Sequence, residues 1–88
     1  MSELKSPLRR TLLRRRTVLM ALGNSNTQLY EAIKAEQITR GIKISHRAVA
    51  WPSDEIDALV TARIEGRSQA EIRTLVQSLH AQRTKDAQ

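Results

Sequence analysis

The spacing of apolar side chains predicts a short helix near the start of the folded part of the chain. Val18, Leu19 and Leu22 have the spacing of one buried helix face, so we expect a helix over residues 16–22. Gly23 stands where a glycine commonly ends a helix. The chain is therefore expected to turn sharply at this glycine.

A second helix is predicted directly after this turn, over about residues 26–36. Ser25 is placed to cap it, because a serine side chain accepts from a backbone N–H two or three residues on. Its core face consists of Leu29 and Ile33, with Tyr30 and Ala32 beside them. Its polar face consists of Asn26, Thr27, Gln28, Glu31 and Lys34. Two short helices joined by a tight turn, with short polar side chains opening the second, are typical of a helix-turn-helix.

A two-stranded ribbon is predicted over residues 42–51, because apolar and polar residues alternate on both sides of a polar turn. Gly41 separates the ribbon from the second helix. The apolar residues expected on one inner face are Ile42, Ile44, Val49 and Trp51. His46 and Arg47 would lie at the tip. A ribbon in this position is a wing, and it favours the helix-turn-helix interpretation more than the two helices alone do.

Two further helices are predicted downstream of the ribbon. Pro52 ends the ribbon, and Asp54 is placed to cap a third helix that Gly66 closes. Ser68 and Glu71 then match a capping box at the start of a fourth helix. The apolar stripes of the two helices are Ile56, Leu59, Val60 and Ile64 for the third and Ile72, Leu75, Val76 and Leu79 for the fourth. We expect the last stripe to cover the core of its own chain; the alternative is self-association with a second copy, or docking on a partner protein.

These elements predict a mainly α fold with a small β-hairpin wing, a winged helix-turn-helix. Residues 1–11 have no apolar periodicity and are expected to form a flexible basic arm. Residues 12–66 form the winged helix-turn-helix domain, and residues 67–88 form a C-terminal amphipathic helix with a polar tail. Leu12 and Leu13 open the folded part, either as a short strand or as a plug for the core.

The composition excludes several classes of protein. At 88 residues the chain holds one domain with a limited core. Cysteine is absent, which excludes disulfides and cysteine-based zinc sites. His46 and His80 are the two histidines, and no glycine-rich phosphate loop is present, so we expect no enzyme, no cofactor, no metal and no small-molecule substrate. No apolar run approaches the roughly 20 residues of a membrane helix, and no signal-peptide pattern is present.

Charge is distributed unevenly along the chain. Residues 1–51 carry a net charge of +7 and residues 52–88 a net charge of −1, which together give the total of +6. A positive field confined to one half favours a polyanionic partner for that half. Nucleic acid is the partner we expect, with an anionic membrane surface or RNA as alternatives. A protein-interaction adaptor without any polyanion is the remaining interpretation.

Several short stretches occur in an order that is similar to a known family. They are LLR at 12–14, VL at 18–19, G-x-S at 23–25, LYEAIK at 29–34, KISHRAVAWP at 43–52 and AR at 62–63. Together they resemble the AlpA-like phage regulators and the related excisionases, which are small MerR-like winged helix-turn-helix proteins. The chain departs from that pattern at Asn26, where a basic residue is frequent, and at residues 35–37, where Ala-Glu-Gln replaces the more usual Glu-Gly-Lys. The helix over 68–83 also lies beyond the shortest members.

The resemblance implies that the second helix enters the major groove of double-stranded DNA and that the wing reaches an adjacent groove. It implies an excisionase, or recombination directionality factor, which binds near an attachment site, bends the DNA and directs a tyrosine integrase toward excision of a mobile element. The alternative is an AlpA-like transcription regulator of a prophage. Either function implies a bacterial cytoplasmic protein at the nucleoid, with cooperative copies along DNA.

The polar face of the second helix supplies the candidates for reading bases: Asn26, Thr27, Gln28 and Glu31. Asn and Gln amides pair bidentately with adenine, a threonine methyl contacts thymine, and a carboxylate accepts from cytosine. Plain exposed helix polarity is the alternative for each of them.

The remaining candidates are expected to contact the DNA backbone or the groove beside the wing. The backbone contacts are Arg14, Arg15, Arg16, Tyr30, Lys34 and Lys43, and the wing contacts are His46 and Arg47. An arginine at a wing tip can enter a narrow minor groove, where the potential is most negative. Phosphate contacts position a protein without specifying sequence. Tyr30 has a core role as its alternative, and Trp51 is expected to stabilise the core.

Overall fold

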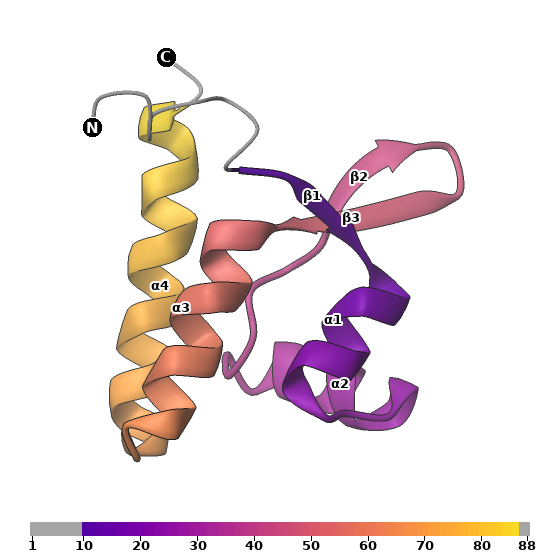
Figure 1. Ribbon diagram of the computed structural model, residues 1–88. Coiled ribbons are helices and arrows are strands. Elements are labelled where there is room, and N and C mark those ends of the chain that lie inside the picture. Colours follow the sequence, from indigo (N-terminus) through magenta and orange to yellow (C-terminus); the bar gives the residue numbers. More distant parts are fainter. Residues whose placement is uncertain (1–9, 87–88) are drawn as a thin grey trace, which may run out of the picture.

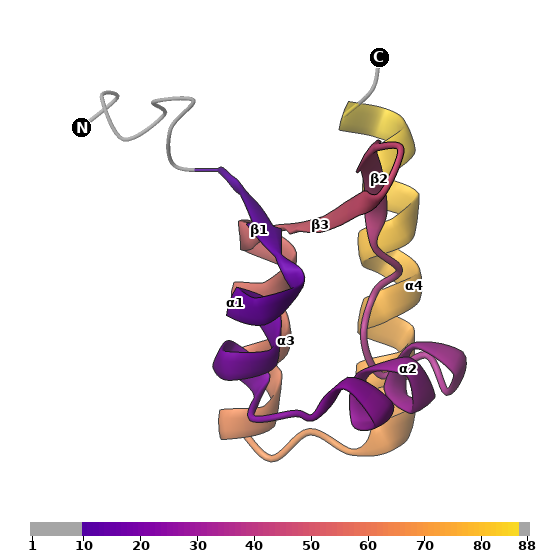
Figure 2. The same cartoon turned by 90° about the vertical axis from the view of Figure 1, so that its right-hand side faces the viewer.

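The computed structural model of the chain describes residues 10–86, which form four helices and a three-stranded sheet (Figure 1). The elements are β1 (Leu12–Arg14), α1 (Arg15–Leu22), α2 (Asn26–Lys34), β2 (Ile42–Ser45), β3 (Ala48–Pro52), α3 (Ser53–Ile64) and α4 (Gln69–Asp86). α3 packs against both α1 and α4. The β2–β3 hairpin projects on the side away from α4 in Figure 1, and in the turned view of Figure 2 it is seen in front of α4. This mainly helical arrangement with a small antiparallel sheet confirms the predicted winged helix-turn-helix.

One hydrophobic core joins both ends of the described chain. Its buried members are Val18, Leu29, Ile38, Trp51, Ile56, Leu59, Ala62, Ile72 and Val76. Val76 of α4 is fully buried beside residues of α1, α2 and α3, so the last helix covers the core of its own chain. The burial of Ile72 and Val76 contradicts their assignment to a self-association surface, because neither side chain is accessible to a second copy. Leu75 and Leu79 are half-buried against the same core.

The helix-turn-helix begins and ends close to the predicted residues. α1 begins at Arg15, and Gly23 ends it with a positive φ of 68°, a conformation that glycine adopts without steric cost. Ser25 caps α2 as expected: its Oγ accepts from the backbone N–H of Gln28 at 3.2 Å. α2 ends at Lys34, two residues before the predicted end.

The chain leaves α2 through an unusual backbone conformation. Glu36 has a φ of +59°, in the left-handed region that costs a non-glycine residue about 1–2 kcal/mol. This position lies within the Ala-Glu-Gln stretch where the sequence pattern more usually has Glu-Gly-Lys. The positive φ explains why glycine suits the position. Glu36 begins an irregular connection to β2, which we call the linker and which consists of residues 36–40.

The sheet differs from the predicted two-stranded ribbon in two ways. β1 pairs with β3 on the side opposite β2, so the order is β1-β3-β2 and Leu12–Arg14 is a strand rather than a plug. Ile42 pairs with Ala50, whereas Lys43 pairs with Val49. Directly opposed residues share a face. Val49 and Trp51 therefore face away from Ile42, and the predicted common inner face of Ile42, Ile44, Val49 and Trp51 is wrong.

Trp51 explains why a glycine precedes β2. A Cβ atom added at Gly41 would lie 3.1 Å from the indole ring of Trp51 and 3.2 Å from Cβ of Val49. The absence of a side chain at Gly41 therefore lets the backbone that enters β2 pass closely over the only tryptophan of the chain. Ile44 lies at the register shift between Lys43 and Ser45, and its side chain is exposed.

The start of α3 corrects a predicted cap. Asp54 lies inside the first turn rather than at the cap, and the helix follows Pro52 directly. The first free N–H of the helix, that of Ser53, donates to the carbonyl of Thr11 at 2.7 Å, and Ser53 Oγ accepts the Thr11 N–H at 2.9 Å. Asp54 instead forms an ion pair with Arg10, 3.2 Å from Nε to Oδ2. Residues 10 and 11 of the predicted arm are thus tied to α3, and residues 1–9 lie outside the described residues.

The end of α3 corrects one member of its apolar stripe. Ile64 is 80% exposed, although Ile56 and Leu59 are buried as predicted. Val60 is half-buried at the edge of the buried face. Ile64 follows four residues later, which is about 40° more than one full helical turn, and its side chain therefore lies in solvent. Ala62 takes the core position in this last turn. The capping box of Ser68 and Glu71 at the start of α4 is confirmed by reciprocal hydrogen bonds of 3.1 and 2.9 Å.

Candidate nucleic-acid interface

Four arginines from three different parts of the chain meet at one surface. Arg14 ends β1, Arg15 and Arg16 open α1, and Arg47 lies in the two-residue turn of the hairpin. These four side chains line a shallow hollow of about 270 Å³, together with Ala48 and Val49. We call this group the arginine hollow. Pairing of β1 with β3, with Arg14 opposite Ala50, is what brings the start of α1 to the base of the hairpin.

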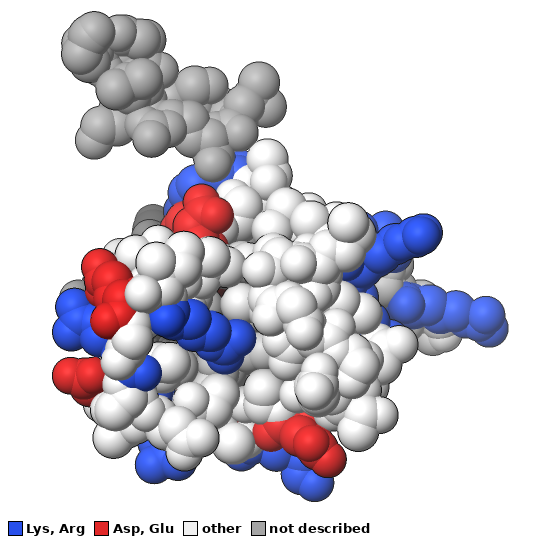
Figure 3. Space-filling view, turned by 60° about the horizontal axis from the view of Figure 1, so that its bottom comes forward, with Lys and Arg blue, Asp and Glu red and all other residues white. Residues whose placement is uncertain are grey.

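The arginine hollow carries concentrated and uncompensated positive charge. Among the described residues, none of its four guanidinium groups has a carboxylate within ion-pair distance. In Figure 3, basic side chains project from the right-hand edge, on the side of the hairpin, while acidic and basic side chains lie together on the left-hand edge. Like charges this close repel one another, so the surface is suited to a partner that supplies negative charge.

Tyr30 connects the arginine hollow to α2. The guanidinium carbon of Arg15 lies 5.4 Å from the centre of the Tyr30 ring, within the range of a cation–π contact. Tyr30 is 52% exposed, so it does not have the core role considered from the sequence. Because Arg15 belongs to the hollow and also covers Tyr30, the exposed face of α2 and the hollow form one surface.

The polar face of α2 is exposed, but its members differ in the groups they have available. Gln28 Oε1 accepts the backbone N–H of Ser25 at 2.9 Å and so completes a capping box with the Ser25 hydroxyl. Its Nε2 remains as a donor. The Asn26 amide forms no hydrogen bond within residues 10–86 and is free to accept and to donate. Ser25 and Gln28 match the spacing of a capping box, so the sequence already held the signal for this second role.

Other predicted contact residues are exposed on α2 and on the hairpin and do not line the hollow. Thr27 and Glu31 are exposed on α2, and Lys34 is exposed in its last turn. Lys43 and His46 are exposed on the hairpin. The structure thus brings together Arg14, Arg15, Arg16, Arg47 and, through Arg15, Tyr30.

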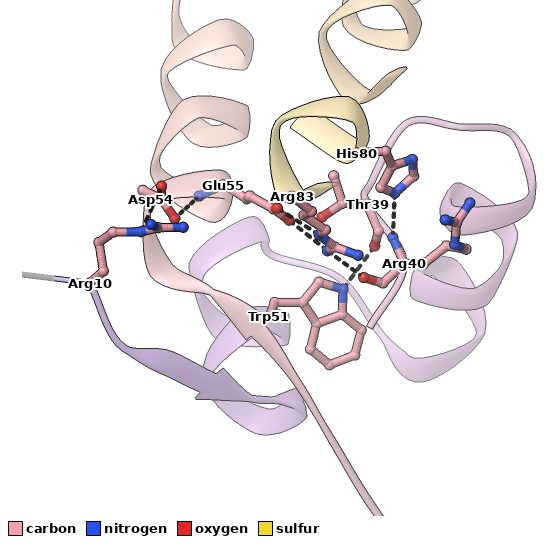
Figure 4. A network of polar contacts seen from close by, with 8 residues as sticks. All are labelled: Arg10, Thr39, Arg40, Trp51, Asp54, Glu55, His80 and Arg83. Carbon is pink, nitrogen blue, oxygen red and sulfur yellow. Dashed lines mark hydrogen bonds and ion pairs between the residues drawn. The ribbon is translucent and has the colours of Figure 1, made fainter. Parts of the chain in front are cut away.

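A second polar network, not predicted from the sequence, lies between α3, α4 and the linker (Figure 4). Glu55 is only 4% exposed, and both of its carboxylate oxygens accept from Arg83 at 2.7 Å. Arg83 Nη2 also donates to the carbonyl of Arg40 at 2.7 Å. The indole N–H of Trp51 donates to the carbonyl of Thr39 at 2.8 Å.

His80 takes part in this network as a hydrogen-bond acceptor. The backbone N–H of Arg40 donates to His80 Nε2 at 3.0 Å, which requires that this nitrogen carry no proton. Burial lowers the pKa of His80 below its ordinary value of 6.5, and the nearby charges of Arg40 and Arg83 lower it further. Glu55 and Glu36 oppose this shift. Burial also lowers the pKa of Arg63, whose Nη2 donates to the carbonyl of Gln37 at 2.8 Å.

Residues 10–86 contain no group of three or more His, Cys, Asp or Glu side chains that could hold a metal ion. No helix in the same range is long and apolar enough to cross a membrane.

Comparison with known proteins gives one finding. The family model described as "Prophage CP4-57 regulatory protein (AlpA)" matches residues 11–64. This range begins just before β1 and ends with α3, so it contains the arginine hollow, α2, the linker and the hairpin but not α4. No match to a curated protein or to a solved structure was found.

Proposed function

The chain belongs to the AlpA family of prophage regulatory proteins, and from this premise we propose that it binds specific sites on double-stranded DNA. The observation that carries this proposal is the arginine hollow beside the exposed face of α2. Its four arginines have no acidic partners in the described chain, so they supply positive charge for contacts with DNA phosphates. A helix with short polar side chains at its N-terminus matches the width of a major groove.

In the proposed complex α2 enters the major groove and the arginine hollow holds the backbone beside it. Arg14, Arg15 and Arg16 contact phosphates, which fixes the register of α2 without reading sequence. Arg47 at the tip of the hairpin reaches the adjacent minor groove. Lys34, Lys43, His46 and the hydroxyl of Tyr30 add further backbone contacts.

Base reading is assigned to the first turn and a half of α2. The Asn26 amide has its oxygen and its nitrogen free, so it can pair bidentately with adenine. Gln28 keeps its oxygen in the capping box and donates through Nε2 to an acceptor on a base edge. Thr27 contacts a thymine methyl or a phosphate, and Glu31 accepts from cytosine or excludes other sites.

We propose that the bound DNA lies near an attachment site and that the protein acts as an excisionase with a tyrosine integrase. Several copies bound side by side would bend the DNA and favour excision. The second candidate is a transcription regulator of a prophage in the cytoplasm, and the description of the matching family as a regulatory protein favours it. Both functions use the same DNA-binding surface.

Two experiments test this proposal in order. Selection from a random duplex pool, followed by titration of the selected duplex against a scrambled one, should give preferential binding that weakens steeply with salt, because bound phosphates release counterions. Equal affinity for both duplexes would remove the sequence-specific claim. A plasmid carrying the attachment sites, the integrase and a reporter from the integrase promoter then separates the two candidates. An excisionase increases excision without a change in reporter output, whereas a regulator changes the reporter alone.

A further inference from the structure

The linker of residues 36–40 connects the two DNA-facing elements, α2 and the hairpin, without forming a helix or a strand of its own. Its path decides how far apart and at what angle these elements lie. Ile38 and Thr39 are fully buried, so the linker is fixed to the protein rather than looped into solvent. What holds each of its residues therefore bears on DNA binding.

Side chains of α4 hold the linker at both of its ends. At the start, Glu36 Oε1 accepts from Gln77 at 3.3 Å and lies 3.8 Å from Nε of Arg73. At the end, the N–H of Arg40 donates to His80 and the carbonyl of Arg40 accepts from Arg83. These partners recur every three or four residues along α4, so they lie on one side of that helix.

The middle of the linker is held from the same side. Gln37 Nε2 donates to the carbonyl of Gln69 at the start of α4, 3.0 Å away, and the carbonyl of Gln37 accepts from Arg63 of α3. Every linker residue from Glu36 to Arg40 is thus buried or hydrogen-bonded. Arg83 is the central contact, because it joins Glu55 of α3 to the last residue of the linker.

α4 lies outside the range of the family match. Figure 1 places it on the opposite side of the molecule from the hairpin. The helix nevertheless supplies most of the side chains that hold the linker. A helix that held only the core would not need a set of polar side chains directed at the segment between α2 and the hairpin.

We propose that α4 is a positioning element that sets the relative placement of α2 and the hairpin through Arg83 and His80. This inference rests on the proposed DNA binding. Loss of an α4 contact lets the linker take other paths, so that only a fraction of the molecules present α2 and Arg47 at the correct separation. The apparent dissociation constant for DNA rises by the inverse of that fraction.

His80 makes this positioning sensitive to pH. A proton on Nε2 would turn the acceptor into a donor facing the N–H of Arg40, and the contact would break. The groups facing His80 are the linker residues Arg40 and Glu36, Glu55 of α3, and Arg83 of α4 itself. DNA affinity should therefore fall as the pH drops below the lowered pKa of His80.

The test uses two conservative variants and one matched control on α4. Arg83→Lys keeps the positive charge but loses the Nε contact to Glu55, and its side chain is one bond too short for the Nη2 position that donates to both Glu55 and Arg40. His80→Gln keeps an acceptor that does not titrate. Ser78→Ala is the control, because Ser78 lies on α4 beside the groove to α3 and its side chain forms no hydrogen bond within the described range. Affinity for the selected duplex is measured against salt at about pH 7.5 and then at stepwise lower pH for as long as circular dichroism shows the helices intact, all in a His46→Gln background that removes the other histidine.

We expect Arg83→Lys to weaken DNA binding about tenfold at an unchanged salt slope, since Arg83 contacts no phosphate. His80→Gln should bind like the parent at the higher pH and lose the weakening at the lower pH. Ser78→Ala should match the parent throughout. A salt slope reduced by about one for Arg83→Lys would mean that Arg83 touches phosphate, and an affinity within twofold of the parent would mean that it does not position the site.

A measurement without DNA separates this inference from the proposed function. Trp51 is the only tryptophan and donates to Thr39 of the linker, so its fluorescence reports linker release. Arg83→Lys should shift Trp51 emission to longer wavelength at a temperature where circular dichroism shows all helices intact. If the parent protein fails to select a duplex, the proposed function is wrong. If the parent binds DNA but Trp51 emission and affinity are unchanged in Arg83→Lys, the positioning role is wrong.

Discussion

On the hairpin side of the molecule, the four guanidinium groups of the arginine hollow have no carboxylate partner among the described residues, whereas three arginines on the α3–α4 side lie beside acids. Arg67 lies 3.1 Å from Glu65, Arg73 lies 3.8 Å from Glu36, and Arg83 forms two 2.7 Å hydrogen bonds with Glu55. The same residue type thus has two roles in one small chain. The four arginines of the hollow are available to a partner, and the three paired arginines stabilise the fold.

This difference has an energetic meaning. Close like charges destabilise the free protein slightly, and a polyanion removes that repulsion on binding. A buried pair has the opposite character: removal of one partner leaves an uncompensated charge in the interior. Substitution on the hairpin side should therefore change binding more than stability, and substitution at Arg83 should change stability first.

The largest expected effect on stability is that of Arg83→Ala. It leaves the Glu55 carboxylate buried without its partner and should lower the free energy of unfolding by about 2–4 kcal/mol, somewhat less than a fully buried pair because Arg83 is partly exposed. Urea unfolding followed by Trp51 fluorescence measures this loss. Arg67→Ala is the control, since an exposed pair contributes only about 0–1 kcal/mol. Equal losses for the two variants would contradict the distinction between them.

The corresponding substitution on the hairpin side is Arg47→Ala. It removes a cation from the arginine hollow and should weaken binding to the selected duplex about tenfold, which corresponds to about 1.4 kcal/mol. The free energy of unfolding should change by less than about 0.5 kcal/mol, because Arg47 is exposed and unpaired within the described range. A collapsed thermal transition would show instead that Arg47 supports the hairpin.

A smaller effect distinguishes the two amides of α2. Asn26→Ala should reduce discrimination at one base pair by about 1–3 kcal/mol and leave stability nearly unchanged. Gln28→Ala should remove half of a capping box and lower stability by about 0.5–1 kcal/mol, with a weaker effect on base preference. Competition binding to duplexes with single substitutions, paired with thermal melts, measures both. The reverse pattern would assign base reading to Gln28.

The smallest expected effect concerns a polar atom in the linker. Thr39 is fully buried, and its Oγ1 has no hydrogen-bond partner in the described structure. Thr39→Val replaces this hydroxyl by a methyl group of similar shape and should raise stability by about 1 kcal/mol. DNA affinity should stay the same, because the substitution keeps the backbone carbonyl of residue 39, which accepts from the indole N–H of Trp51. A destabilised variant would show that the hydroxyl is satisfied in solution.

Local signals in the sequence were enough for most of the helical structure. Gly23 ended α1, Ser25 capped α2 and the Ser68–Glu71 pair opened α4 because caps and turns depend on residues only a few positions apart. The β2–β3 hairpin was found for the same reason. The inner face of the hairpin was predicted wrongly. Apolar and polar residues alternate in both strands, and this alternation does not determine the register, that is, the pairs of residues that lie opposite each other.

Long-range contacts account for what the sequence did not reveal. In the sequence Glu55 is an acid near the start of α3 and Arg83 lies close to the polar tail, and neither position indicates a buried pair. Their pairing depends on how α4 packs along α3, 28 residues away in the chain. The convergence of Arg47 with Arg14 likewise depends on the pairing of β1 with β3. The cations of the interface were therefore predictable one by one, but their common site was not.

The most direct test of the account is the salt dependence of DNA binding in three proteins: the parent, a variant with Arg15→Ala and Arg47→Ala together, and a variant with Arg67→Ala. The logarithm of the binding constant falls linearly with the logarithm of salt concentration, with a slope of about 0.9 for each phosphate contact. Loss of two contacts from the arginine hollow should reduce that slope by about two, and Arg67→Ala should leave it unchanged. An unchanged slope in the double variant, or an equal reduction in Arg67→Ala, would contradict the assignment of the hollow to the DNA backbone.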